Sequence, residues 1–172
     1  MTKLTESEYN RNKQEVTMKN FRFNRYLMLR YTIALFFFVN LYWFIILWER
    51  GFTWIFPGAL MLLAISATYE QLRLYGDKSK KINKKLDFNH YFYFVQTVVN
   101  ICLIVIALTG LLYQNLFPFL TNAMKTRLVL SGGLILGVGL SLLCLKRIKN
   151  IKENKDKFYG QIKEFERQKR KI

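Results

Sequence analysis

Five polar side chains within or beside two long apolar segments are the residues of this chain best suited to chemistry. Four of them follow steps of three and four along one segment, and on a helix such steps place residues on one face. Their groups are amides and a phenol, which donate and accept hydrogen bonds without charge at neutral pH. The five residues are Asn40, Asn89, Tyr93, Gln96 and Asn100.

This polar stripe supports two interpretations. It could hold two helices together as an amide clasp, or it could line a substrate path open to the cytoplasm. Asn40 and Asn100 each lie nine residues from the start of their apolar segment, so both amides are expected near the middle of a bilayer. We favour the clasp, because an interhelical hydrogen bond in lipid contributes about 0.6–2 kcal/mol and no ionised side chain lies at that depth to couple to a proton.

One acidic residue lies near the interior of an apolar segment. Glu70 is about 10 Å from the centre of its segment by helix rise, and Arg73 follows three residues later. A proton-coupled transporter would need a carboxylate placed more deeply. Because residues three apart on a helix can pair, we expect an ion pair between Glu70 and Arg73 at the inner interface.

Motifs that carry catalysis are absent from the sequence. There is no Cys-x-x-Cys, no histidine cluster and no glycine-rich phosphate loop, and no paired acids lie at a membrane face. The two cysteines, Cys102 and Cys144, lie at different expected depths, so we predict no disulfide between them. We therefore expect no enzymatic activity, no catalytic residue, no metal and no cofactor.

Four apolar blocks position the stripe. The first, residues 31–48, contains 18 uncharged residues, and a helix of that length covers about 27 Å of the ~30 Å hydrocarbon core. Only helices satisfy their own backbone in lipid at this length. The blocks predict a transmembrane domain over residues 31–145 with spans at about 31–48, 52–72, 91–113 and 128–145.

The basic residues predict the orientation of these spans. Of the 27 Lys and Arg residues, 24 lie in residues 1–30, 73–85 and 146–172, on one side of the four spans. Cytoplasmic segments carry this excess. The predicted fold is an all-α membrane protein of two helical hairpins, with both termini in the cytoplasm and basic flanking helices. Once the spans are recognised, the net charge of +16 no longer indicates nucleic-acid binding.

The flanking segments suggest membrane or partner contacts. Residues 1–30 form a basic segment that is either an interfacial helix or only a topological flank. Residues 146–172 predict a basic amphipathic helix that could pair with itself in a homodimer, with residues 1–30 or with a partner protein, or lie on the membrane. Lysines of the middle loop are candidate contacts for anionic lipid of the inner leaflet, although topology alone explains them and is favoured. They are Lys78, Lys80, Lys81, Lys84 and Lys85.

Small residues mark one face of the fourth span. Gly133, Gly137 and Ser141 are spaced by four, and such patterns accompany close helix packing in membranes. The partner is either another span of the same chain or the fourth span of a second copy, and the former is favoured. The second span is a plausible partner because it contains small residues, namely Gly58, Ala59, Ala64, Ala67 and Thr68.

The function expected from these features is binding without chemistry. We predict a multi-pass protein of a cell membrane, bacterial by its Lys, Ile, Asn and Phe content, that acts as an accessory or scaffolding subunit. Its basic segments would bind anionic lipid or a protein partner. The alternative is a small oligomeric transporter or lipid-handling subunit that uses the polar stripe. An immunity-type protein that shields the membrane from a peptide toxin is a further, weaker alternative.

Overall fold

The computed structural model describes residues 6–49, 51–76 and 86–169. All regular secondary structure in these residues is helical, and four of their helices are long and apolar enough to cross a membrane. This confirms the predicted all-α class and the prediction of four helices long and apolar enough to be spans. In chain order the elements are α1 (Glu6–Leu47), η1 (Gly51–Trp54), α2 (Ile55–Gly76), α3 (Asp87–Thr109), α4 (Tyr113–Leu116), α5 (Met124–Lys152) and α6 (Lys157–Lys169).

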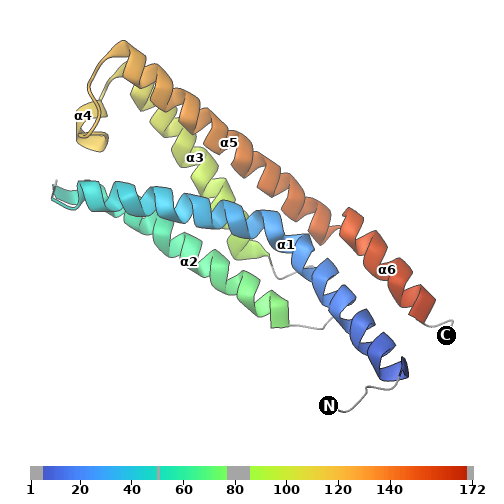
Figure 1. The fold of residues 1–172 in the computed structure, drawn as a ribbon. Helices are drawn as coiled ribbons and strands as arrows, with labels where there is room; N and C mark the ends of the chain where they lie inside the picture. Colours follow the sequence, from blue (N-terminus) through green and yellow to red (C-terminus); the bar gives the residue numbers. More distant parts are fainter. Residues whose placement is uncertain (1–5, 50, 77–85, 170–172) are drawn as a thin grey trace.

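The helices pack as an elongated bundle (Figure 1). α2 packs along α1, α5 packs along α3, and α2 also contacts α3, so the two pairs meet through α2 and α3. α6 returns to α1 beyond the end of α5. We call the end where α2 finishes, α3 begins and α5 gives way to α6 the basic end. The opposite end, which holds η1 and α4, is the aromatic end.

Helix ends differ from the predicted span limits for identifiable reasons. α3 ends at Thr109 rather than near Tyr113, because Gly110 adopts a left-handed conformation with φ 76° and its N–H bonds to the carbonyl of Ile106. This is a usual glycine stop for a helix. The apolar residues after Gly110 continue the composition of the span without continuing its helix.

The flanking segments are also organised differently from the prediction. α1 is one helix of 42 residues, so the described part of the N-terminal segment is the beginning of the first span's own helix rather than a separate interfacial helix. The C-terminal segment is two helices rather than one. α5 continues to Lys152, the chain turns at Asn154 with φ 53°, and α6 starts at Lys157.

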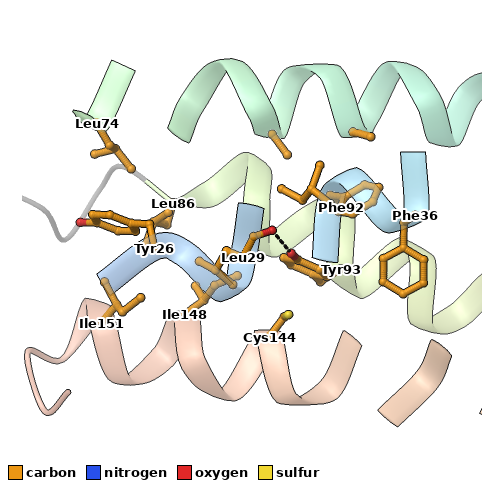
Figure 2. Packing of buried hydrophobic residues seen from close by; sticks show 13 residues of the cluster. Tyr26, Leu29, Phe36, Leu74, Leu86, Phe92, Tyr93, Cys144, Ile148 and Ile151 are labelled. Carbon is orange, nitrogen blue, oxygen red and sulfur yellow. Dashed lines mark hydrogen bonds between the residues drawn. The ribbon is translucent and has the colours of Figure 1, made fainter. Parts of the chain in front are cut away.

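Two clusters of buried apolar side chains form the interior. The larger lies toward the basic end and joins α1, α2, α3 and α5 around residues such as Leu29, Phe92 and Ile148 (Figure 2). The smaller lies toward the aromatic end around Trp43, Leu103 and residues of α4. Much of the remaining apolar surface is exposed, including Phe38 and Ile65, as expected where lipid replaces water as the solvent.

Candidate functional site

Three amides of the predicted stripe form one buried chain between the two apolar clusters. The Asn40 side-chain amide donates to Gln96 Oε1 at 3.3 Å, and Gln96 Nε2 donates to Asn100 Oδ1 at 3.0 Å. All three residues are buried. These hydrogen bonds join α1 to α3 between the two apolar clusters.

Gly137 explains how closely α5 approaches this amide layer. A Cβ atom added at Gly137 would lie 2.7 Å from Asn100 Nδ2, whereas one added at Gly133 would meet nothing within 4 Å. Ser141 is buried on the same side of α5, and Gly133 is exposed. The predicted small-residue face is thus divided, with Gly137 and Ser141 turned into the bundle. Within the described residues α5 packs mainly against α3 rather than against the second span, which the sequence had offered as a plausible partner.

The other two members of the stripe have different partners. The Tyr93 hydroxyl donates to the carbonyl of Leu29 on α1 at 2.8 Å (Figure 2). Asn89 Nδ2 donates to the carbonyl of Ala67 at 3.0 Å, and its Oδ1 accepts from Gln71 Nε2 at 2.5 Å. The five residues therefore do not line one continuous path, because each bond ties α3 to a particular point on α1 or α2.

Glu70 caps the beginning of α3. Its carboxylate accepts the backbone N–H groups of Asp87 at 2.9 Å, Phe88 at 3.3 Å and Asn89 at 2.9 Å. These are donors that a helix cannot satisfy internally, and the negative charge also complements the positive end of the helix dipole. Among the described residues, no ion pair joins Glu70 to Arg73, because the carboxylate faces α3.

A buried ion pair lies at the basic end. Arg25 Nη2 is 2.6 Å from Asp156 Oδ1, and the side chains are 2% and 0% exposed. Arg25 Nε also donates to the same oxygen at 3.1 Å, and Nη2 reaches the carbonyl of Ile151 and Oδ1 of Asn154, each at 3.1 Å. We call this group of contacts the Arg25 latch. It fixes the turn between α5 and α6 to the side of α1.

Asp156 also organises α6 itself. Its Oδ2 accepts the backbone N–H of Tyr159 at 3.2 Å, which is the bond an N-cap residue makes to the third helical position. The Tyr159 ring lies 5.4 Å from the Arg25 guanidinium. Asp156 is not among the residues predicted from the sequence. Its place after Asn154 and before an amphipathic run signals a helix start, but no local signal indicates a partner 131 residues away.

Exposed basic side chains surround the latch. Lys149 lies near the end of α5, Lys155 lies in the turn, and Lys157, Lys163 and Arg167 lie on α6. Lys152 bonds to Asp87 Oδ1 at 2.5 Å and so joins α5 to the start of α3. The middle-loop lysines Lys78, Lys80, Lys81, Lys84 and Lys85 lie outside the described residues.

Aromatic side chains pack against one another at the aromatic end. Trp43 stacks on Phe117 with centroids 5.8 Å apart and planes 7° apart, and its indole N–H donates to the carbonyl of Leu116 at 2.8 Å. Arg127 donates to Asn122 Oδ1 at 2.6 Å and lies 5.5 Å from the Tyr113 ring centroid. The connection between α3 and α5 is therefore partly packed into the bundle.

Neither the arrangement of side chains nor similarity to other proteins assigns chemistry here. Both cysteines are free, as expected, with Cys102 exposed and Cys144 buried. No three His, Cys, Asp or Glu side chains in the described ranges lie together as metal ligands. The chain matches no family model, no curated protein and no solved structure in the comparisons made.

Proposed function

We propose that this protein is a non-catalytic accessory or scaffolding subunit of a membrane assembly. In this proposal its four spans anchor it in a bacterial cytoplasmic membrane with both termini in the cytoplasm. The basic end then presents a fixed cationic surface to an acidic face of a partner protein. The mechanism is binding, and its specificity comes from complementary charge at a defined position.

The Arg25 latch is the observation that carries this proposal. A basic flank that only sets topology needs positive charge and no fixed shape. Here α6 is held by an ion pair whose two side chains are almost fully buried. Burying two charges costs several kcal/mol per ion, so such a pair is poorly explained by stability alone and is better explained by fixing one geometry. A fixed geometry is useful where the surface must be recognised.

The surface that α6 presents fits an acidic partner. Lys157, Lys163 and Arg167 are exposed on this helix and outnumber Glu164, an acidic side chain exposed beside them, while Asp156 is buried in the latch. Charge complementarity of this type accelerates association and excludes like-charged partners. The described contacts support the transporter alternative less, because the amides of the stripe are bonded to each other and to neighbouring helices.

Partner recovery tests the proposal. The full chain is purified from its own membranes in mild detergent, beside a variant with Lys157→Gln, Lys163→Gln and Arg167→Gln. A Lys125→Gln variant is the control, since Lys125 is exposed at the beginning of α5 toward the aromatic end. We expect a stoichiometric partner with the wild type and control, and its loss with the triple variant. Equal recovery by all three, or a self-assembled oligomer without a partner, would overturn the proposal.

Orientation has its own test. Single cysteines are placed at the exposed positions Asn115 and Lys163 in a chain with Cys102→Ser and Cys144→Ala. A membrane-impermeant maleimide should label position 115 in intact cells and position 163 only after permeabilisation. The reverse pattern would contradict the proposed cytoplasmic location of α6.

A further inference from the structure

The connection between α3 and α5 contains no charged residue. Residues 110–124 include no Asp, Glu, Lys, Arg or His, although a segment that passes through water between two spans is normally polar. The connection lies at the aromatic end of the bundle (Figure 1). We propose that it is a lipid-binding surface, which lies against the leaflet at that end with Leu111, Leu112 and Phe119 at the boundary between headgroups and acyl chains.

The large apolar side chains of the connection differ in exposure. Some are buried and anchor the connection to the bundle, among them Tyr113 and Leu116. Three others are largely exposed: Leu111 at 69%, Leu112 at 64% and Phe119 at 51%. Exposure of such side chains is unfavourable in water and favourable at the apolar side of a membrane interface. The buried residues hold the exposed ones in a defined position for that contact.

The backbone at the two leucines is strained. Leu112 has φ 54°, which is the left-handed conformation, and it follows the left-handed Gly110 by two residues. A Cβ atom makes this conformation unfavourable, and strained backbone is retained where other interactions compensate for it. Transfer of the exposed side chains of Leu111 and Leu112 from water into lipid would supply such compensation.

Phe119 is held by a series of aromatic rings that begins inside the bundle. Trp43 stacks on Phe117, and the Phe119 ring packs edge-on against Phe117 with centroids 6.3 Å apart. Trp43 and Phe117 are both buried, so the series runs from the interior to the surface. Phenylalanine and leucine are typical of the apolar face of segments that lie in a membrane interface. The exposed part of the Phe119 ring is therefore presented by a supported side chain.

The neighbouring helices place the connection at the boundary of the membrane. α3 has 23 residues, which correspond to about 34 Å of helix and cross the ~30 Å hydrocarbon core. At the other end of the connection, Lys125 is exposed near the start of α5, and a lysine there keeps its charge at the headgroup level. Outside α4 the backbone of the connection is irregular, so it must keep access to water and cannot enter the core.

Continuity with the spans distinguishes lipid from a second copy of the chain. Val105 and Leu108 precede the connection on α3, Leu128 and Val129 follow it on α5, and all four side chains are exposed. A bilayer that surrounds these two helices therefore also meets the connection between them. A stable interface with a second copy buries about 800 Å² on each side, which three exposed apolar side chains do not supply. The connection also has no charge with which to select a protein partner.

Collisions of spin labels with oxygen and with a water-soluble nickel chelate test the proposal. A single cysteine replaces Leu112, Phe119 or Asn115 in a chain with Cys102→Ser and Cys144→Ala, and each labelled protein is placed in vesicles of dioleoyl phosphatidylcholine. Oxygen concentrates among the acyl chains, whereas the nickel chelate stays in water. Labels at positions 112 and 119 should collide more with oxygen. The matched control is position 115, an exposed polar position of α4, where collisions with nickel should dominate.

The chain with its native side chains provides a second measurement, because a nitroxide is itself apolar. The methyl groups of Leu111 and Leu112 are observed by nuclear magnetic resonance in nanodiscs of the same lipid. A doxyl-labelled lipid should broaden both sets of resonances, and a water-soluble gadolinium chelate should broaden them less.

Two kinds of result would overturn the proposal. The first is dominant collision with nickel at position 112 or 119, or stronger broadening of the leucine methyl groups by the gadolinium chelate. The second is protection from both the lipid and the water reagents, because a second copy or a protein partner would then cover the surface. The triple variant of α6 should give the same result as the wild type, so this inference and the proposed function can fail separately.

Discussion

The two ends of the bundle are closed by different chemistry. At the basic end, directional polar contacts join the helices: the Arg25 latch ties α1 to the turn before α6, and Glu70 of α2 caps α3. At the aromatic end, Trp43 and Phe117 stack, and one indole hydrogen bond adds direction to this packing. The amide layer of Asn40, Gln96 and Asn100 lies between the two ends.

This difference indicates where geometry is specified. Ring packing is favourable over a range of arrangements, whereas a buried ion pair with its surrounding hydrogen bonds tolerates little displacement. The basic end is therefore the part of the molecule whose surface is held in one arrangement. Substitutions at each end, and in the layer between them, test whether the basic end is held more rigidly than the aromatic end.

The largest effect is expected at the latch. Asp156→Ala leaves the Arg25 charge buried without its partner, and breaking such a pair costs about 3–5 kcal/mol. We expect α6 to detach while the spans remain folded, so that its amides exchange hydrogen about 100-fold faster or more. Glu153→Gln is the control, because Glu153 pairs with Lys155 in the same turn at an exposed position. Unchanged exchange in α6 of Asp156→Ala would show that the latch does not hold this helix.

A smaller effect is expected from the cap on α3. Glu70→Gln removes the charge that accepts three backbone N–H groups and should lower the free energy of unfolding by about 1–2 kcal/mol. Unfolding in mixed micelles with increasing sodium dodecyl sulfate measures the change. Glu49→Gln serves for comparison, because Glu49 is exposed near the end of α1. If the two variants were equally stable, the cap would contribute nothing.

A weaker effect is expected at the aromatic end. Trp43→Phe retains a ring to stack on Phe117 and loses the bond to the Leu116 carbonyl. We expect a loss of about 1 kcal/mol in the same unfolding assay, the usual net contribution of a neutral hydrogen bond. Trp48→Phe, at an exposed ring, should change stability less. A loss larger than that of Glu70→Gln would reverse the contrast between the two ends.

The smallest effect is expected in the amide layer. Gly137→Ala forces the Asn100 amide to move, whereas Gly133→Ala meets open space. Alanine favours the helix at both positions by about 0.5–1 kcal/mol. Gly137→Ala should therefore be the less stable of the two by about 0.6 kcal/mol, the average contribution of one interhelical hydrogen bond in a membrane protein. If Gly133→Ala instead has the lower free energy of unfolding, this result would indicate that a second copy packs on that face.

The fold could be predicted from the sequence to the level of its spans. Long uncharged blocks identify membrane helices because the physics of lipid leaves few alternatives, and most of each block lies on one long helix of the structure. Helix ends were predicted less well. The start of α3 at Asp87 depends on Glu70, 17 residues earlier on another helix. A cap supplied from a neighbouring element leaves no local pattern to recognise.

The candidate site could be predicted where contacts follow helical spacing or matched depth in the spans, as for Asn40 and Gln96. Gln96 and Asn100 are one turn apart, and their bond could be expected from that spacing. The partners of Tyr93 and Asn89 could not, because they depend on how α1 and α2 pack against α3. The latch was missed for the same reason. Arg25 resembled every other arginine of a basic flank, and only the tertiary structure places it against Asp156.

The distance between α1 and α6 in a lipid bilayer shows whether the Arg25 latch holds α6 in one position. Spin labels are placed at the exposed positions Asn20 and Lys163 in a chain with Cys102→Ser and Cys144→Ala, and pulsed electron paramagnetic resonance measures the distance distribution. We expect one narrow distribution that broadens when Asp156 is replaced by Ala. A broad distribution in the parent chain, or an identical narrow one in both, would contradict the claim that the Arg25 latch fixes this surface.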